Sequence, residues 1–418
     1  MAGTIVVGAG IVGTTTALYL ARAGEEVTVL DNRPAAGLET SYANGGLLAA
    51  NSALPWSAPG TPGLLMKWLG REDVPLTLRP SAIPGLGLWG LRFLANCRKG
   101  KYRRTALALT RLGQASLEEL NGLLDGNLVD AKIWTGGHLE IFRGPHAVEE
   151  AGRSKRFLED MGAETELLDA RGCVALEPTL EPVRSRIGAG LVLKKDAWGD
   201  ARLFSAATAD GAGRLGVDFR YDCRVDRIEA EGGRVRAVHA NGQRLAADRV
   251  IVCAGPHSPG LVKPLGVSLP IAPVKGYSMT LMKEDIGFLP GMPVLDEFER
   301  MAVTPLGDRL RVAGTVEFDG FNGEIRPGRI ANLTNALKRL YPDLTMPREI
   351  NAWCGMRPMS ADGLPFIDAA PVGGLFVNTG HGAVGWTLAC GSARLIADIV
   401  TCREKAGSSP FRLGRSIW

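Results

Sequence analysis

The spacing of apolar and polar positions predicts that the chain opens with a strand, a helix and a second strand. Residues 5–7 are a short apolar run typical of a buried strand, and residues 14–23 have helical spacing and end at Gly24. Residues 27–30 form a second apolar run of strand length. Together they predict the first βαβ-type segment of an α/β fold.

Three glycines at G-x-G-x-x-G spacing, Gly8, Gly10 and Gly13, join this first strand to the helix. Such glycines make a tight turn, let a pyrophosphate approach the backbone and let the helix pack on the strand. The helix N-terminus offers free N–H groups to the phosphates. Asp31 stands at the tip of the second strand, where a carboxylate can accept both ribose hydroxyl protons. The stretch predicts a dinucleotide site and leaves open whether the dinucleotide is FAD or NAD.

The rest of the chain alternates between helical and strand-like segments. Period-two alternation predicts a β-meander that leads into a buried strand ending at Gly255, and a glycine at such a strand end is where an open α/β sheet receives its ligand. Residues 51–87 are rich in proline and glycine and are predicted to be mostly irregular. The predicted helices are 105–124, 146–161, 200–215 and 329–340, the strands are 138–144, 271–282 and 309–318, and the meander segments are 217–221, 225–229 and 235–240.

A second G-x-G-x-x-G run, Gly380, Gly382 and Gly385, stands between a short strand and a helix over residues 386–400. The nearest acid at a suitable spacing, Asp398, falls late in that helix and not at the tip of a following strand. We therefore expect this turn not to bind NAD. Its other use is to point a helix N-terminus at a flavin ring, where N–H groups stabilise negative charge.

The segment 40–50, T-S-Y-A-N-G-G-L-L-A-A, follows the second strand. It is either a flexible loop or a segment in which Ser41, Asn44 and the pair Gly45-Gly46 wrap a diphosphate and pass close to a flat ring. The residues alone leave these two interpretations nearly even.

Length and composition limit the function classes. A chain of 418 residues is long enough for two domains, and a net charge of +4 does not indicate nucleic-acid binding. Seven scattered cysteines without metal-type spacing favour a reducing, cytoplasmic compartment, and no metal site is predicted. We expect no leader before the first strand and no membrane span, since the nearest apolar run, 83–97, is short and interrupted by Arg92.

One segment has an unusual charge. Residues 74–117 contain no acidic residue and eight basic ones, and part of this segment, 86–111, also carries several Leu, Trp and Phe residues. Such a segment suits a peripheral membrane contact, in which each cation near anionic lipid contributes about 1 kcal/mol. The alternative is a solvated basic face over an ordinary core.

Three further residues are candidates for substrate chemistry. Arg357, in W-C-G-M-R-P, is either a structural ion-pair partner or a bidentate clamp on a substrate carboxylate. Tyr277, in P-V-K-G-Y-S, adds a hydroxyl to the same carboxylate or merely packs. His381 lies inside the second glycine turn and is expected to shape it and hydrogen-bond, not to act as a base.

With these residues collected, the chain resembles the flavoproteins of the D-amino acid oxidase superfamily, and among them the bacterial D-amino acid dehydrogenases of the small subunit type. The resemblance covers the first strand to about residue 397. Its specific blocks are T-S-Y-A-N-G-G with P-W-S-A-P-G at 55–60, V-K-G-Y-S at 274–278, and G-M-R-P-M-S-A-D-G-L-P-F-I at 355–367 joined to N-T-G-H-G-A-V-G-W-T-L-A-C-G-S at 378–392.

The resemblance implies an α/β fold with a glutathione-reductase-type, Rossmann-like FAD domain and an inserted substrate domain of mixed β-sheet and helices. The expected boundaries are 1–84, 165–265 and 350–418 for the first, and 85–164 and 266–349 for the second. Arg357 and Tyr277 would hold the substrate carboxylate. The residues expected to bind FAD are Gly8, Gly10, Gly13, Asp31, Ser41, Asn44, Gly45, Gly46, Val225, Gly255, Gly380, His381, Gly382, Gly385, Trp386 and Thr387.

The implied reaction is FAD-dependent oxidative deamination of D-amino acids. A hydride passes from Cα to flavin N5, the imino acid hydrolyses to a 2-oxo acid and ammonia, and a quinone or similar acceptor takes the electrons. We expect noncovalent FAD, because Cys354 is offset from the thiol of covalent relatives. Alternatives are a hydroxy-D-proline dehydrogenase, a glycine or sarcosine oxidase using oxygen, and an NAD(P)H-dependent flavin reductase or monooxygenase. The expected location is cytoplasmic, or peripheral on the inner face of the membrane.

Overall fold

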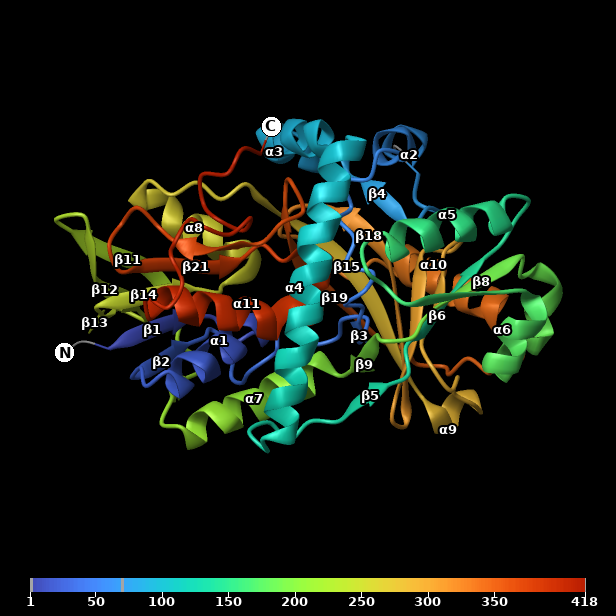
Figure 1. The fold of residues 1–418 in the computed structure, drawn as a ribbon, viewed down its shortest axis with the longest axis horizontal. Coiled ribbons are helices and arrows are strands. Elements are labelled where there is room, and N and C mark those ends of the chain that lie inside the picture. The colour runs from blue at the N-terminus through green and yellow to red at the C-terminus, as the bar shows by residue number, and fades with distance from the viewer. Residues whose placement is uncertain (1–2, 69–70, 418) are drawn as a thin grey trace.

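A computed structural model describes residues 3–68 and 71–417. The left half of Figure 1 is built on a six-stranded sheet in the order β10-β2-β1-β14-β21-β20. All neighbouring strands run parallel except β20, which is antiparallel to β21. The strands come from three separate parts of the chain: β1 (Thr4–Val7), β2 (Val27–Leu30), β10 (Asp218–Arg220), β14 (Arg249–Val252), β20 (Phe366–Ala369) and β21 (Leu375–Thr379).

Alternate residues of these strands serve two different cores. Val6, Val29 and Ile251 face a helical layer, whereas Val7 and Val250 face the meander on the opposite side of the sheet. The helices are α1 (Ile11–Arg22), α7 (Ala201–Arg214) and α11 (Gly385–Val400), with the short α8 (Ser258–Val262) on the meander side; the meander is β11 (Val225–Glu231), β12 (Arg234–Ala240) and β13 (Gln243–Ala246).

The right half of Figure 1 is built on a nine-stranded sheet in the order β19-β15-β18-β17-β16-β6-β8-β7, with β4 also paired to β18. Helix α10 (Pro327–Leu340) packs on one face of it. Its strands are β4 (Leu76–Leu78), β6 (His138–Phe142), β7 (Thr165–Leu168), β8 (Ala189–Leu193), β15 (Ile271–Met282), β16 (Val294–Asp296), β17 (Met301–Leu306), β18 (Arg309–Phe318) and β19 (Asn351–Ser360), and α5 (Ala147–Glu159), α6 (Ala170–Leu176) and α9 (Lys283–Ile286) flank them.

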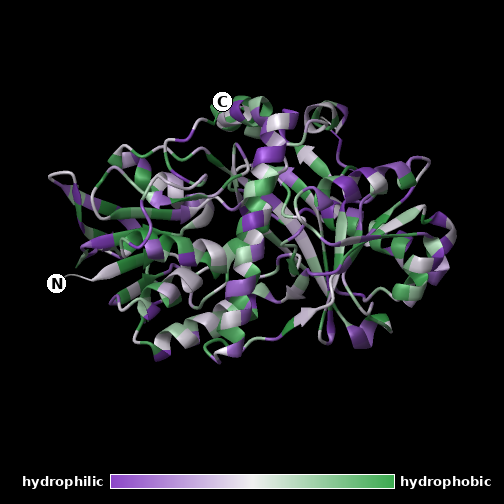
Figure 2. Cartoon of the chain, in the orientation of Figure 1, coloured by the Kyte–Doolittle hydropathy of each residue, from purple (hydrophilic) through white to green (hydrophobic). Residues whose placement is uncertain are grey.

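Two elements connect the halves. The long helix α4 (Lys99–Asp125) crosses the centre of Figure 1 and packs against α11, and Figure 2 shows the alternating hydropathy of an amphipathic helix along it. A small sheet pairs β3 (Leu47–Leu48) and β5 (Ile133–Thr135) with β9 (Ala197–Gly199).

The sheets divide the chain differently from the predicted domain boundaries, whose outermost residues 1–2 and 418 lie outside the described ranges. Strands β4, β7, β8 and β19 belong to the nine-stranded sheet, although the prediction placed them in the FAD domain. Helix α4 packs on the core of the six-stranded sheet, although it was predicted in the substrate domain. Residues 217–221 contribute β10 to the parallel sheet and not to the meander. Which sheet a strand joins depends on distant partners, which local periodicity does not report.

Residues 51–87, predicted to be mostly irregular, contain α2 (Thr61–Trp68), β4 and the start of α3 (Ile83–Asn96). Helix α3 bends at Gly87, whose φ of 14° and ψ of −107° are not helical. Within the described residues, one helical stretch, Gly382–Val400, is long and apolar enough to cross a membrane, but 67% of it is buried inside the fold. It is the core helix between α1 and α4.

Candidate functional site

The first glycine turn has no room for side chains. Gly8 has φ +107°, and a Cβ there would lie 2.7 Å from the carbonyl oxygen of Cys253. A Cβ at Gly13 would overlap the carbonyl oxygen of Gly8. Gly10 instead precedes α1 and has no side chain to cap it, so the N–H groups that follow Ile11 in the first turn stay open toward a bound anion.

Asp31 and Ser41 complete this turn. The N–H of Ala9 donates to Asp31 Oδ2 (2.5 Å) and that of Arg33 to Asp31 Oδ1 (2.8 Å), while burial raises the pKa of the carboxyl. Ser41 Oγ accepts from the N–H of Ile11 at 3.0 Å, so its own proton is free to be donated to a diphosphate oxygen. Both side chains therefore lie at the start of α1.

The segment after Ser41 is fixed to the nine-stranded sheet by three hydrogen bonds to consecutive carbonyl groups. Ser278 Oγ donates to Ala43 O (2.6 Å), and Arg311 Nη1 donates to Asn44 O (2.8 Å). Thr304 Oγ1 donates to Gly45 O at 2.7 Å. The segment is therefore an ordered bridge between the two halves and not a flexible loop, and its contact with a diphosphate stays a prediction.

The loop also needs its glycine and asparagine. Gly46 has φ +77°, and a Cβ there would lie 3.1 Å from Thr304 Cγ2. Its N–H donates to Asn44 Oδ1 at 3.1 Å, so Asn44 shapes the turn with its side chain and leaves its backbone to Arg311.

The second glycine turn brings the N-terminus of α11 to β19. Gly380 (φ +82°) and Gly382 (φ +58°) make the turn, and His381 forms a backbone bridge with Met359 of β19. Burial lowers the pKa of His381 to about 3, so its imidazole is neutral, and its Nε2 has no hydrogen-bond partner. The first turn of α11 has no side-chain cap.

Four further predicted residues have distinct surroundings. Trp386 packs on Phe204 in the helical core with 4.8 Å between ring centroids, and thereby holds the start of α11 in place together with its buried neighbour Thr387. Gly255 (φ +52°) follows β14, and its carbonyl accepts from Thr379 Oγ1 at 3.1 Å at the end of β21. Val225 begins β11, two residues after Cys223, whose N–H donates to Asp31 O.

Arg357 lies on the face of the nine-stranded sheet that meets the bridging segment. The register pairs Arg357 with Val274, Gly355 with Gly276 and Trp353 with Ser278, and side chains of such alternate pairs share one face. Because Ser278 on this face bonds Ala43, Arg357 points toward the same side. A Cβ at Gly276 would overlap its guanidinium, so the side chain crosses bare backbone.

The guanidinium of Arg357 is buried without a counter-ion among the described residues. Burial lowers its pKa to about 10, and Nη1 has no hydrogen-bond partner. Its nearest aromatic contact is Trp56, with 5.5 Å from Cζ to the ring centroid. A buried unsatisfied donor of this kind is costly unless something binds it.

Aromatic residues pack beside the strand that carries this cation. Trp89 of α3 donates its indole N–H to Met359 O at 2.9 Å and stacks on Phe93, with 5.2 Å between ring centroids. Trp89 also contacts Phe318 of β18, at 5.8 Å. Helix α3 therefore covers the end of the strand that carries Arg357, at Met359, with an apolar layer.

The predicted partner of Arg357, Tyr277, is not brought to it. The register pairs Tyr277 with Cys354, an odd number of residues from Arg357, so both lie on the opposite face of the sheet. The Tyr277 hydroxyl donates to Glu317 Oε2 at 2.6 Å, and burial raises its pKa. This geometry contradicts a carboxylate shared by Arg357 and Tyr277. It also places the Cys354 thiol, which donates to Gly323 O, away from the Arg357 face.

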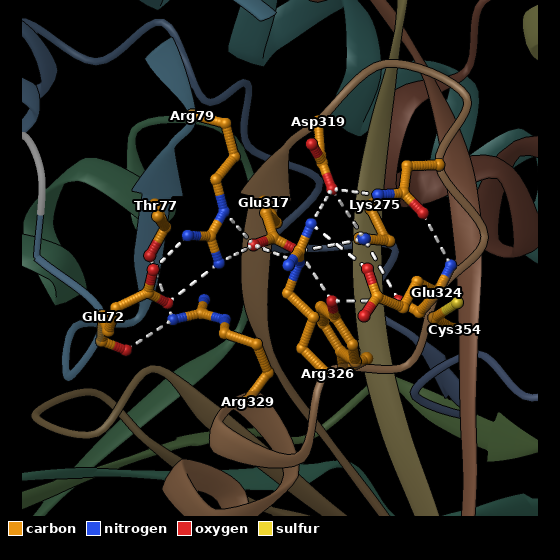
Figure 3. A network of polar contacts seen from close by, with 12 residues as sticks. Glu72, Thr77, Arg79, Lys275, Glu317, Asp319, Glu324, Arg326, Arg329 and Cys354 are labelled. Atoms are coloured by element: carbon orange, nitrogen blue, oxygen red, sulfur yellow. Dashed lines mark hydrogen bonds and ion pairs between the residues drawn. The ribbon is translucent and has the colours of Figure 1, made fainter. Parts of the chain in front are cut away.

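Tyr277 instead belongs to a buried polar network, shown in Figure 3, that sequence reasoning missed. Lys275 Nζ lies 3.0 Å from Glu317 and 3.1 Å from Asp319. Arg79 Nε donates to Glu317 Oε1 at 2.6 Å. Arg329 donates to the carbonyls of Glu72, Val74, Pro75 and Val316 and to Thr77 Oγ1. The network ties β4 and the chain entering α3 to β15, β18 and α10.

The two glycine turns, Asp31 and Ser41 thus surround the carboxyl ends of the parallel strands, and Arg357 faces the same space from the other sheet. The N-termini of α1 and α11, whose own N-cap residues make no side-chain cap, and the bare glycines fit a bound FAD, with the diphosphate at the first turn. The arrangement provides anion binding, a buried cation for a carboxylate and a dry enclosure.

Comparisons with known proteins agree with this geometry. Residues 4–399 match the family described as FAD dependent oxidoreductase. D-amino acid dehydrogenases from Methylobacterium nodulans (43% identical over 400 residues; 96% of this chain and 95% of theirs) and Dechloromonas aromatica (39% over 412 residues; 97% and 99%) are similar in sequence.

Two solved structures are similar in fold. Glycine oxidase from Bacillus cereus has a TM-score of 0.77 at 20% identity and full coverage of both chains. The L-α-glycerophosphate oxidase from Mycoplasma pneumoniae with FAD bound has a TM-score of 0.71 at 18% identity, over 99% of this chain and 98% of that one. With a family match over nearly its whole length, the chain belongs to the FAD-dependent oxidoreductases.

Proposed function

We propose that this protein uses bound FAD to oxidise D-amino acids to imino acids, which hydrolyse to 2-oxo acids and ammonia. The observation that carries the proposal is the buried, unpartnered guanidinium of Arg357 on the sheet face that meets the FAD-binding segment. The curated relatives named D-amino acid dehydrogenase support the substrate class.

Each residue around Arg357 has a defined task in this reaction. The planar guanidinium binds the substrate carboxylate through two N–H groups and so fixes the position of Cα. Gly276 leaves room for this guanidinium to lie flat on the strand, and the Trp353 ring covers the neighbouring Gly355. When bound, FAD supplies the acceptor for the hydride that leaves Cα.

In this proposal the reaction depends on the position of the substrate, and no side chain acts as a base near Cα. His381 is neutral, so it leaves the carboxylate to Arg357 and adds no competing charge. The N-terminus of α11 directs its N–H groups at the site from the neighbouring strand end, where they stabilise developing negative charge. Trp56 and Trp89 exclude water.

The electron acceptor in this proposal is a quinone, reached at a membrane surface. Helix α3 presents an apolar outer face: Leu88 and Leu91 are more than half exposed, and Met66 of α2 is 76% exposed. Figure 2 shows this hydrophobic character along α3 at the top of the view. The exposed bases Arg98, Lys99, Arg103 and Arg104 follow directly at the start of α4. An apolar face beside cations suits an anionic bilayer surface on the cytoplasmic side.

Anaerobic mixing tests the reaction. The yellow holoprotein is mixed with D-alanine, D-proline, cis-4-hydroxy-D-proline, glycine, sarcosine, the matching L-isomers and NADPH, and the flavin absorbance is followed. We expect bleaching by D-amino acids and none by the L-isomers or NADPH. Bleaching by NADPH alone would replace the proposal with a flavin reductase. If D-amino acids bleach the flavin, its reoxidation by oxygen is compared with its reoxidation by a quinone dye to identify the electron acceptor.

Vesicle pelleting tests the membrane contact separately. We expect the protein to pellet with vesicles of anionic phospholipid, and Arg103→Glu with Arg104→Glu, or Leu88→Ser with Leu91→Ser, to abolish this. The matched control, Arg153→Glu with Arg156→Glu on α5, makes the same charge change elsewhere on the surface. Equal pelleting of all variants would refute the contact while leaving the reaction untouched.

A further inference from the structure

A second site of different character lies at the far part of the nine-stranded sheet. Strands β6 and β16 run parallel, and an open cavity of about 570 Å³ forms where both end. Four strand spacings separate β16 from β19, so the two strands lie roughly 20 Å apart across the sheet. Its size is within the usual range of small-molecule sites.

Arg143, directly after β6, is the buried charge of this cavity. Its side chain is only 8% exposed, and its Nη2 lies 2.7 Å from Asp296 Oδ2. Even so, its Nε and Nη2 atoms make no hydrogen bond of good geometry. The other oxygen of Asp296 is occupied by the N–H groups of Phe298 and Glu299, at 3.1 and 3.3 Å. Nη2 of Arg143 is thus held by the ion pair with Asp296, and its buried Nε is left without a hydrogen-bond partner among the described residues.

The rim adds charge and an apolar surface. Arg339, in the last turn of α10, is held by both oxygens of Glu299, at 2.6 and 2.8 Å. Arg186 is exposed and donates to the carbonyl of Arg339 at 3.3 Å, with no carboxylate in ion-pair distance among the described residues. Phe298 is 66% exposed beside them.

The charges do not cancel. Three guanidinium groups, those of Arg143, Arg186 and Arg339, line the cavity against the two carboxylates of Asp296 and Glu299. One positive charge is left over, and it is presented as planar N–H donors next to an aromatic ring.

We propose that this cavity binds a small organic acid through one carboxylate, with the apolar body of the ligand against Phe298. One leftover positive charge matches one carboxylate, and the exposed guanidinium of Arg186, which has no carboxylate in ion-pair distance among the described residues, supplies the two-point contact with it, beside the buried charge of Arg143. The assignment does not depend on the reaction catalysed at Arg357, because binding alone defines it.

Calorimetric titration of the holoprotein tests the proposal, with hexanoate, 3-methyl-2-oxobutanoate and inorganic phosphate as probes. All titrations are repeated in an Arg357→Met background, so that carboxylate binding at the substrate site is removed. We expect a carboxylate to bind in that background with a Kd of about 1 mM or tighter, and phosphate to bind more weakly.

Variants at the cavity then locate the binding. Arg143→Met should weaken it about tenfold or more. This change also leaves the buried Asp296 without its cation, so the variant can lose stability. Ser185→Glu and Arg186→Ala change only the exposed rim of the cavity and should also weaken binding. Arg184→Ala is the control, since Arg184 is paired with Glu181 on the same segment and does not line the cavity.

Three results would overturn the site. Loss of all binding in the Arg357→Met background would place every carboxylate at the substrate site. Equal affinity in the Ser185→Glu and Arg186→Ala variants would exclude the cavity. Tighter binding of phosphate than of either carboxylate would refute the ligand class. None of these results bears on whether D-amino acids bleach the flavin.

Discussion

Arg357→Met separates two effects of the buried Arg357 cation, which is expected to lower the stability of the protein and to bind the substrate carboxylate. Methionine keeps a flexible apolar side chain and removes the charge. No described carboxylate pairs with Arg357, and burial lowers its pKa from the ordinary 12.5 to about 10. That shift corresponds to roughly 3 kcal/mol of unfavourable burial at neutral pH. We therefore expect Arg357→Met to raise the free energy of unfolding, by about 1 to 3 kcal/mol.

The same substitution should strongly lower kcat/KM. A bidentate guanidinium–carboxylate contact consists of two charge-assisted hydrogen bonds of about 1.5 to 3 kcal/mol each. Their loss predicts a fall in kcat/KM of about 10² to 10⁴-fold for D-amino acids. FAD should stay bound, because Arg357 lies on the other sheet from the glycine turns.

Arg415→Met is the matched control for stability. Arg415 is also buried, but its guanidinium donates to both oxygens of Asp362, at 2.7 and 3.1 Å, and to the carbonyl of Leu364 at 2.7 Å. Removing one partner of a buried pair costs about 3 to 5 kcal/mol. Urea unfolding of the holoproteins should thus move in opposite directions for the two variants.

Two results would refute the reasoning on Arg357. If Arg357→Met loses stability as Arg415→Met does, the guanidinium has a structural role after all. If kcat/KM falls less than tenfold, it is not the carboxylate clamp. A supporting sign is that an unreactive carboxylate raises the melting temperature of the wild type more than that of Arg357→Met, in which only binding at the Arg143 cavity is left.

Three other substitutions test the positions of single residues. Tyr277→Phe should cost about 1 to 2 kcal/mol of unfolding free energy, because Glu317 loses a buried donor, and should change KM less than twofold; a large rise in KM would return Tyr277 to the substrate site. Gly276→Ala should displace the guanidinium of Arg357 and lower kcat/KM at least tenfold with FAD retained, whereas unchanged kinetics would mean that the strand need not be bare. Asp31→Asn should weaken FAD binding about tenfold or more in a reconstitution assay, and equal affinity would exclude the carboxylate from the ribose contact.

Local signals predicted the nucleotide-binding half well. The first strand, helix and second strand were predicted at 5–7, 14–23 and 27–30, and the structure has them at Thr4–Val7, Ile11–Arg22 and Val27–Leu30. The spacing of apolar residues and the spacing of the glycines predict the same strand, helix and strand there, because all of these signals come from about 30 consecutive residues. The helix after the second glycine turn was confirmed for the same reason.

Non-local pairing explains what could not be predicted. The block V-K-G-Y-S lies in the predicted strand 271–282, whereas G-M-R-P was recognised as a block of the family with no strand predicted there, and only the observed register shows that Arg357 and Tyr277 lie on opposite faces. A shift of one residue would exchange the faces, and nothing in either block fixes it. The buried network around Glu317 was missed because its members are up to 257 residues apart.

Two buried histidines should give the stability of the protein opposite dependences on pH. Burial lowers the pKa of His381 to about 3, below the ordinary 6.5. The unfolded chain then binds a proton that the folded protein refuses, so stability is lost as pH falls from 6.5 toward 3, by about 2 kcal/mol at pH 5. For His138, burial alone would lower the pKa, but Asp196 and Glu140 raise it to about 9.

His138 therefore contributes stability below pH 6.5 and loses it as pH rises toward 9, by roughly 3 kcal/mol in all. Urea unfolding at pH 5, 7 and 9 measures both slopes. We expect His381→Asn to remove only the loss of unfolding free energy between pH 7 and pH 5. We expect His138→Asn to remove only the loss between pH 7 and pH 9. If instead His381→Asn changed the loss at high pH and His138→Asn the loss at low pH, the imidazole of His138, and not that of His381, would be neutral in the folded protein. His381 would then carry a charge beside Arg357, and the substrate site would hold two cations for its carboxylate.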